Sequence, residues 1–232
     1  MFNEIADLLR GNADTFAAAQ RVERDAAVIG YLAVAKRTAE LINDLYWKAK
    51  DVRAATWLGQ LGLHYCLTHA SGITSEEASG LRLAAKEMAF NIGSYAWPGW
   101  AEPGITITEP VLGIGRDASR LNLRLAMELN RPAKGKSNAH WLIGAYAIVD
   151  RQTADAVAHF EQAAAFSEEA NDPAAAMMNR TYACLARLAA DATSADCAAS
   201  LENALSVLQV SGLEDAKFYA GQIRTAHKVF VS

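Results

Sequence analysis

Residues 138–173 read NAHWLIGAYAIVDRQTADAVAHFEQAAAFSEEANDP. Gly144 lies in a first apolar segment of this stretch. In the second segment, Ala156, Phe160 and Ala163 follow one another at helical steps. A small residue in one helix, followed by a small, large, small series in the next, lets two antiparallel helices pack closely and leaves a face for a further pair. The stretch therefore predicts one helix-turn-helix unit of an all-α stack.

The next helix pair carries Leu201 and Ala204 in the places that Phe160 and Ala163 hold here. This order of residues resembles the tetratricopeptide repeat. Gly144 takes the small-residue slot of that family, Ala156 and Ala163 its two small positions, and Phe160 its large one. Trp141 stands one residue from the usual aromatic position, and Ala147 replaces the expected tyrosine.

The resemblance implies a right-handed superhelix of antiparallel helix pairs, a TPR-like α-α superhelix. We expect it to cover residues 73–232. Residues 1–72 are less regular, and we expect them to form a helical cap or a dimerisation element.

Helical periodicity and abundant alanine favour helix along the remaining sequence as well. The predicted helices cover residues 2–10, 15–50 with a break, 52–69, the segment from the Thr74–Glu77 capping sequence to about 95, 109–129, 138–150, 153–170, 174–191, 195–210 and 213–230. Three prolines fall between residues 97 and 110, so residues 97–104 must form a loop. Residues 131–136 are expected to form a second, shorter connector.

Charge and composition limit the classes of partner and the compartment. The chain has 22 basic and 26 acidic residues and a net charge of −4, scattered along the sequence, which argues against nucleic acid and anionic membrane surfaces. No apolar run reaches the ~18 residues of a membrane span, and the first residues lack the pattern of a signal peptide. We therefore expect a cytoplasmic protein. Its three cysteines, Cys66, Cys184 and Cys197, are expected to be reduced, although the last two lie on neighbouring predicted helices and could approach one another.

No pattern of catalytic or metal-binding residues stands out. Residues 113–118 fit the glycine pattern of a dinucleotide loop, but no βαβ unit accompanies them, so close helix packing is the preferred interpretation. His64 and His69 flank Cys66, and the steps from His64 are two and five residues, whereas ligands on one helix face need steps of three or four. His140 and His159 are isolated in the sequence. We expect no catalytic residue, no cofactor and no metal site.

The resemblance also implies a concave groove lined by the first helix of each pair. The inward positions around Gly144 would be Asn138, Trp141, Ala145 and Ile148, and Arg180 would extend the groove along a neighbouring helix. The Lys/Asn pattern that holds a terminal carboxylate in some members is not present. An aromatic, apolar groove suits a peptide or protein segment, so the sequence favours a non-enzymatic binding scaffold.

Three questions stay open at this point. Trp97 and Trp100 in the Pro/Gly-rich loop form either a binding knob or a plug that folds back onto the stack. The ligand can also be a small molecule or peptide sensed inside the superhelix, which would require a buried apolar pocket with a few polar groups. A homo-oligomer is expected if the terminal helices present apolar outer faces.

Overall fold

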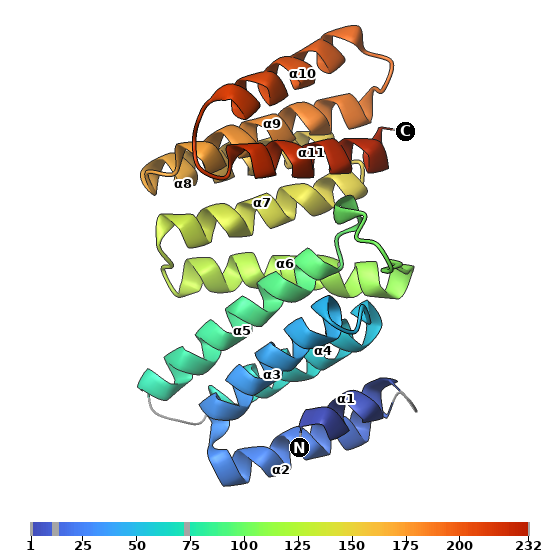
Figure 1. The fold of residues 1–232 in the computed structure, drawn as a ribbon. Coiled ribbons are helices and arrows are strands. Elements are labelled where there is room, and N and C mark those ends of the chain that lie inside the picture. Colours follow the sequence, from blue (N-terminus) through green and yellow to red (C-terminus); the bar gives the residue numbers. More distant parts are fainter. Residues whose placement is uncertain (1, 11–13, 72–74, 232) are drawn as a thin grey trace. The chain divides into compact units, whose positions relative to one another are not determined.

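The computed structural model describes residues 2–10, 14–71 and 75–231 (Figure 1). The protein is all-α, 83% helical, and no strand occurs in these ranges. In chain order the elements are α1 (Phe2–Arg10), α2 (Thr15–Ile29), α3 (Tyr31–Trp47), α4 (Val52–His69), α5 (Ser75–Tyr95), the short 3-10 turn η1 (Pro98–Trp100), α6 (Glu109–Glu128), α7 (Ala133–Val149), α8 (Thr153–Glu169), α9 (Pro173–Ala190), α10 (Ala195–Val210) and α11 (Ala216–Phe230). None of the described helices has the length and apolar sequence of a membrane span. The cytoplasmic location stays a prediction.

The chain divides into two compact units. Unit 1 holds residues 1–96 and 104–125, and unit 2 holds residues 97–103 and 126–232. The turn η1 belongs to unit 2 although it precedes α6 in the sequence, and α6 crosses the division near its C-terminal end. The boundary expected near residue 72 adjoins residues outside the described part, and it stays a prediction.

In unit 1, helices α3, α4 and α5 pack on one another, and α1 and α2 lie against α3 and α4. Two glycines on α4 allow the close crossing. A Cβ on Gly59 would lie 2.3 Å from Cδ1 of Ile92, and a Cβ on Gly62 would lie 2.7 Å from Sδ of Met88. Both partners belong to α5, so the α4–α5 contact depends on small residues in the same way as the pair predicted around Gly144.

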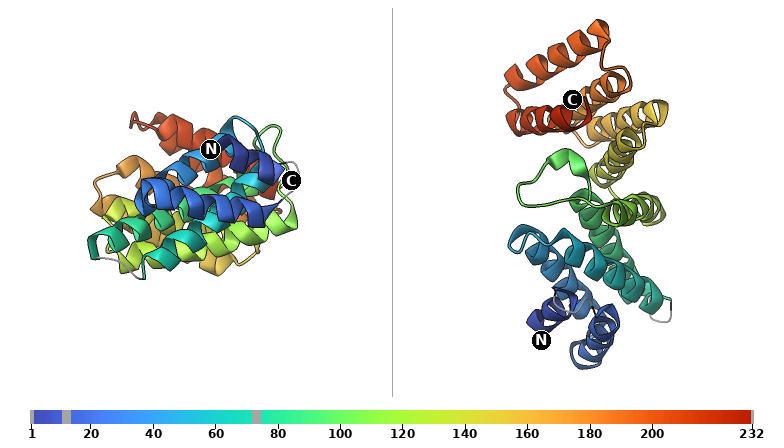
Figure 2. Two further views of the ribbon diagram at one scale, coloured as in Figure 1. Left: turned by 90° about the horizontal axis from the view of Figure 1, so that it is seen from below. Right: turned by 90° about the vertical axis from the view of Figure 1, so that its right-hand side faces the viewer.

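In unit 2, successive helices pack side by side. Helix α7 lies against α8, α8 against α9, and both α10 and α11 against α9 (Figures 1 and 2). A Cβ on Gly144 would lie 2.9 Å from the ring of Phe160, which is fully buried. This contact confirms the small and large residues that the sequence pairs across two antiparallel helices. The packing of consecutive helix pairs is compatible with a helical repeat fold.

The helix ends differ from the sequence prediction at three places. Helix α7 begins at Ala133, because the amides of Gly135 and Lys136 donate to the carbonyl of Pro132 and so form a first turn where a connector was expected. The break expected in the helix over residues 15–50 falls at Gly30, whose φ is +87°, but the second part ends at Trp47 rather than near residue 50. Helix α11 begins at Ala216 rather than at residue 213. Thr74 of the predicted capping sequence lies outside the described residues.

The remaining loop predictions concern α6. Residues 113–118 lie inside α6, so they form part of a continuous helix and not a phosphate loop. Residues 105–107, which precede the helix, adopt no regular secondary structure. Close packing does not explain Gly113, however, because a Cβ there would meet no atom within 4 Å.

Cys66 lies fully buried on α4, and burial raises the pKa of its thiol to about 12. Cys184 and Cys197 are half-buried. Because the thiolate is the reactive form, we expect Cys66 of the folded chain to react with Ellman's reagent at pH 8 about 100-fold more slowly than the half-buried Cys197. Burial also raises the pKa of the Cys184 thiol, so Cys184 should react at an intermediate rate. A Cys66→Ala variant should lose only the slow phase. A single common rate for all three thiols in the native protein would contradict this expectation.

The same shift predicts a dependence of stability on pH. The pKa of Cys66 in the folded chain lies above its ordinary value of 9.0, so the folded state keeps a proton that the unfolded state loses. The stabilisation from the neutral thiol is therefore fully present below pH 9. It declines as the pH rises from 9 toward 12.

Candidate binding surface

Trp97 lies at the centre of the candidate surface and is buried. Its side chain is 1% exposed, and its Nε1 donates a hydrogen bond of 3.0 Å to the carbonyl oxygen of Ala145 on α7. The backbone of the turn lies directly on the indole, since a Cβ on Gly99 would come within 2.3 Å of that ring. The loop therefore folds back onto the helices at Trp97, as the plug alternative requires.

Trp97 belongs to a connected group of aromatic side chains from five elements of unit 2, in which Phe160 is joined through Tyr182. We call this group the Trp97 cluster, and its members are Trp97, Trp100, Trp141, Phe160, Tyr182 and Phe230. The ring centroid of Trp97 lies 5.6 Å from that of Trp141 and 5.7 Å from that of Phe230 on α11. Tyr182 stacks on Phe160 at 5.4 Å. The cluster therefore joins η1 to α7, α8, α9 and α11.

Trp100, like Phe230, is a half-buried member of the cluster, whereas the other members are buried. It stacks on Trp141 with the ring centroids 5.5 Å apart and the planes at 26°, and it meets Trp97 edge to face at 4.8 Å. Aromatic pairs favour both geometries. These two contacts fix the orientation of Trp100, so its remaining exposed surface is held in one position.

Asn138 lies on α7, one turn before Trp141, and is exposed. Within the described residues, the structure shows no hydrogen bond to or from its side-chain amide. The amide therefore offers donors and an acceptor to solvent. Trp141 links the two residues, because it stacks on Trp100 and lies one turn of α7 from Asn138. We call Trp100, Trp141 and Asn138 the Trp100–Asn138 surface.

The other predicted groove residues occupy different surroundings. Ala145 and Ile148 are buried, so the middle of the expected groove on α7 is covered, in part by the Trp97 turn of the same chain. Arg180 is exposed on α9, and its guanidinium forms an ion pair with Glu168 at the end of α8. The structure thus places Trp97, Trp100 and Trp141 in one cluster, while Arg180 joins α9 to α8.

Sequence reasoning missed Tyr182 and Phe230 as members of the cluster. Tyr182 is fully buried, and burial raises the pKa of its phenol. The apolar periodicity of residues 174–190 indicates that Tyr182 faces a helix neighbour. It does not indicate which residue lies opposite, and no local pattern links Phe230 to Trp97.

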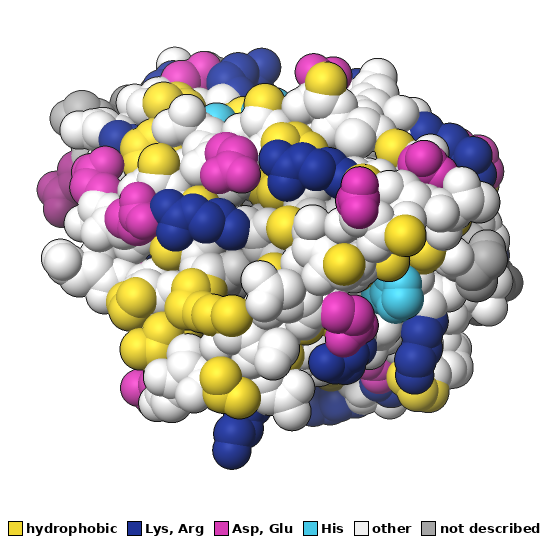
Figure 3. Space-filling model, turned by 90° about the horizontal axis from the view of Figure 1, so that it is seen from above, with side chains coloured by type: hydrophobic (Ala, Val, Ile, Leu, Met, Phe, Trp, Pro, Cys, Tyr) yellow, Lys and Arg dark blue, Asp and Glu magenta, His cyan; other side chains and the backbone are white. Residues whose placement is uncertain are grey.

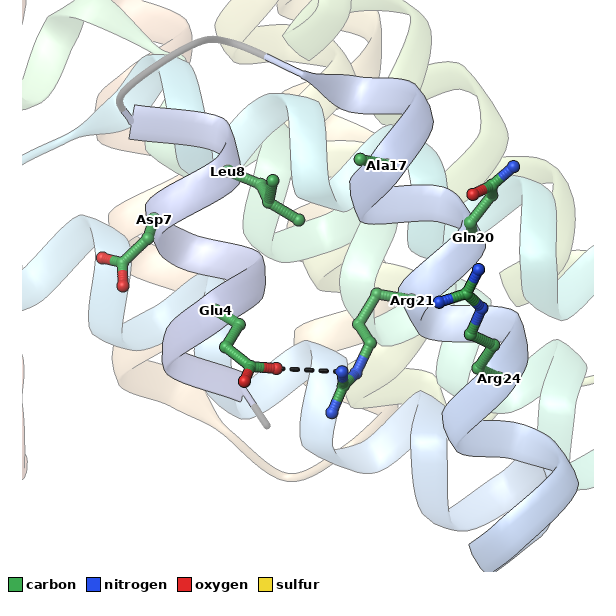
Figure 4. Close-up of a pocket in the computed structure, with 7 residues that line it drawn as sticks. All are labelled: Glu4, Asp7, Leu8, Ala17, Gln20, Arg21 and Arg24. Carbon is green, nitrogen blue, oxygen red and sulfur yellow. Dashed lines mark ion pairs between the residues drawn. The ribbon is translucent and has the colours of Figure 1, made fainter.

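An open cleft of 550 Å³ lies between α1 and α2 in unit 1 (Figure 4). It is lined by Glu4, Asp7, Leu8, Ala17, Gln20, Arg21 and Arg24. Arg21 and Glu4 point toward one another across the cleft, with Nη1 and Oε2 3.0 Å apart, and Arg21 also pairs with the buried Asp25. Two carboxylates thus already neutralise Arg21, which weakens any attraction to an anionic ligand. The small-molecule sensor stays a prediction.

Exposed apolar side chains also occur at the C-terminal helices. Val207 and Val210 on α10 are 49% and 78% exposed, and Phe218 on α11 is 62% exposed. On the face shown in Figure 3, hydrophobic side chains are interspersed with both basic and acidic ones. This mixture agrees with the scattered charges of the sequence. Homo-oligomer formation stays a prediction.

Two histidines that are isolated in the sequence come together in the structure. Nδ1 of His140 on α7 lies 3.0 Å from Nδ1 of His159 on α8. His69 instead contacts the carboxylate of Glu23 and stacks on Tyr31 at 4.3 Å. Within the described ranges, no group of three or more His, Cys, Asp or Glu side chains is arranged to hold a metal ion.

Comparison with protein families, with curated protein sequences and with solved structures gives no match for this chain. A functional assignment must therefore come from the residues themselves. The most specific arrangement among them is Trp100, oriented by two ring contacts, with the exposed amide of Asn138 one turn of α7 from its stacking partner Trp141.

Proposed function

We propose that the protein is a non-enzymatic scaffold that binds a peptide or protein segment at the Trp100–Asn138 surface. The observation that carries this proposal is the fixed orientation of Trp100, whose ring is held by Trp141 and Trp97 while part of it remains exposed. A rigid aromatic side chain loses little conformational entropy on binding and buries a large area, and such residues dominate binding energies at protein interfaces.

The neighbouring polar group specifies the chemistry of the partner. A tryptophan face accepts an aromatic or proline side chain, and the amide of Asn138 can both donate to a peptide carbonyl and accept from a peptide N–H. The surface therefore suits a segment that presents one apolar ring and an accessible backbone next to it.

We further propose that the helix pairs of unit 2 form a right-handed superhelix of the tetratricopeptide kind. The close contact of Gly144 with Phe160 and the packing of α7 on α8 and of α8 on α9 support it. The proposal differs from the family's usual mode in one respect. Because the Trp97 turn covers the central positions of α7, we place the ligand at the margin of the groove rather than along its floor.

Selection from a random-peptide phage library tests the proposal. Peptides enriched on the full-length chain should bind a Trp100→Ala variant about 10-fold more weakly or worse, since loss of an interface tryptophan commonly exceeds 1.4 kcal/mol. A Trp100→Tyr variant keeps a ring and should retain part of the affinity. Asn138→Ala should weaken binding to a smaller extent.

Trp47 supplies a matched control for this experiment. It is 54% exposed on α3 of unit 1, so Trp47→Ala also removes a surface indole. We expect it to leave peptide binding unchanged. Failure to enrich any peptide, or equal retention by the wild type and Trp100→Ala, would rule out the proposed surface.

A further inference from the structure

Helix α2 of unit 1 exposes two large apolar side chains, one near each end. Phe16 is 74% exposed and Val28 is 75% exposed, although the opposite face of the same helix is buried against unit 1. Single exposed apolar residues are common on protein surfaces, so neither residue alone indicates a binding site. The order of the residues between them is what indicates an interface.

Phe16, Gln20, Arg24 and Val28 follow one another at steps of four along α2, and all four are exposed. Side chains at this spacing form one ridge on a helix surface, and two such ridges interlock when the helix axes cross at about −50°. We call these four residues the α2 ridge. It is apolar at both ends and polar in the middle. When a twofold axis through its midpoint relates two copies, the helices run antiparallel, and Phe16 of one copy faces Val28 of the other.

The charged residues beside the α2 ridge are complementary in the same arrangement. Arg21 and Glu23 lie one residue before and one residue after the midpoint, so each faces the opposite charge of the second copy. Within one chain, Arg21 pairs with Glu4 and Glu23 contacts His69. These contacts orient the two side chains, which remain 32% and 54% exposed. Complementary charges of this kind set the register of an interface.

The middle of the α2 ridge borders the open cleft between α1 and α2, because Gln20 and Arg24 also line that cleft. Among the described residues, the structure shows no hydrogen bond or ion pair for either side chain. In the antiparallel pair, the Arg24 guanidinium of one copy faces Gln20 of the other, whose side-chain carbonyl can accept a hydrogen bond from it. The second copy thus offers partners to two polar groups that have none within the chain.

The other wall of the cleft, on α1, suits the same occupant. Glu4 and Leu8 are four residues apart on α1, just as Arg24 and Val28 are on α2, and Figure 4 shows Glu4 opposite Arg21. Because α1 and α2 run antiparallel, α2 of the second copy runs parallel to α1. Its Arg24 then faces the Glu4 carboxylate, and its Val28 faces Leu8. An apolar side chain meets an apolar one and a cation meets an anion on this wall as well.

We propose that two copies of the chain associate through α2, with the two α2 helices antiparallel about Val22 and each seated in the α1–α2 cleft of the other copy. The occupant is a second copy because each side chain of the α2 ridge meets its complement in the same ridge, as a twofold interface requires. Two helices of 15 residues and the adjoining cleft walls form an interface below the standard size. We therefore expect a dissociation constant on the order of 10 µM. The interface uses no residue of the Trp100–Asn138 surface, so its test is independent of peptide binding.

Sedimentation equilibrium of the full-length chain, at concentrations from about 1 to 300 µM, tests the proposal. The wild type should change from monomer to dimer across this range. Phe16→Lys places a cation against Val28 of the second copy, and Val28→Glu places a carboxylate against Phe16. Each should weaken self-association about 10-fold or more, because an apolar contact is lost and a charge is desolvated without a partner.

Mixing the two variants tests the register of the interface. In a mixed dimer, the introduced lysine faces the introduced glutamate at one contact, while Phe16 and Val28 meet as in the wild type at the other. An equimolar mixture of Phe16→Lys and Val28→Glu should therefore associate about 10-fold more tightly than either variant alone. A change in fold or in general solubility would not produce this recovery.

Val210→Glu is the matched control, because Val210 is 78% exposed on α10 of unit 2. It should leave the dissociation constant of the dimer unchanged. A wild type that stays monomeric over the whole range would overturn the proposal, since α2 would then receive another partner or none. Unchanged association of Phe16→Lys, a mixture that stays monomeric, or an equal loss in Val210→Glu would overturn it too. All the substituted positions are exposed, so the variants should stay folded, which far-UV circular dichroism establishes.

Discussion

Replacing Trp97 by alanine should lower the free energy of unfolding of unit 2 by about 3–5 kcal/mol, the usual cost of truncating a buried tryptophan. Trp97 is 1% exposed and contacts Trp100, Trp141 and Phe230 through its ring. The substitution leaves a large cavity where η1, α7 and α11 meet. It also removes the donor to the carbonyl of Ala145. Guanidinium unfolding, followed by circular dichroism, measures the loss.

A Trp97→Phe variant separates the ring from the hydrogen bond. It keeps an aromatic ring in the cluster but cannot donate to Ala145, and we expect a smaller loss of about 1–3 kcal/mol. Trp47→Ala removes an exposed indole from unit 1 and should cost much less. A loss below about 1 kcal/mol for Trp97→Ala would show that the turn is not held by its tryptophan.

Replacing Gly144 by alanine should destabilise unit 2 by about 1–3 kcal/mol, because the added methyl overlaps a rigid ring. The new Cβ would lie 2.9 Å from the ring of Phe160, which is fully buried and cannot move freely. A double-mutant cycle with Phe160→Leu tests this cause. Gly144→Ala should cost less in the Phe160→Leu background, giving a coupling energy above about 0.5 kcal/mol.

Gly221 on α11 provides the control for Gly144. It is exposed, and a Cβ there would meet no atom within 4 Å. Gly221→Ala should therefore stabilise the helix by about 0.5–1 kcal/mol, from helix propensity alone. If Gly144→Ala were equally stabilising, or additive with Phe160→Leu, the close α7–α8 contact would not be the reason for the glycine.

Local sequence signals predicted most of the helices because each signal acts within a few residues. Asp51 before α4, Asp172 before α9 and Ser194 before α10 each accept a hydrogen bond from an amide of the first turn. The start of α7 was wrong because Pro132 accepts from the amides of that turn with its backbone carbonyl. No capping side chain is needed there, so the usual signal is missing.

The candidate surface was predictable only in part. The sequence identified Trp97, Trp100 and Trp141 as important large side chains. It could not decide whether the apolar face of α7 is open to a partner or covered by the same chain, because both arrangements require the same apolar residues. The contact between His140 and His159 depends on how α7 and α8 align along their lengths. Spacing within one helix carries no information about that alignment.

The most direct test of the account is the affinity of one labelled peptide, selected on the wild-type chain, measured by fluorescence anisotropy. The account predicts that Trp100→Ala weakens binding about 10-fold or more, that Asn138→Ala weakens it less, and that Trp47→Ala leaves it unchanged. An unchanged dissociation constant for Trp100→Ala, or an equal loss for Trp47→Ala, would contradict the claim that Trp100 and Asn138 form the binding surface.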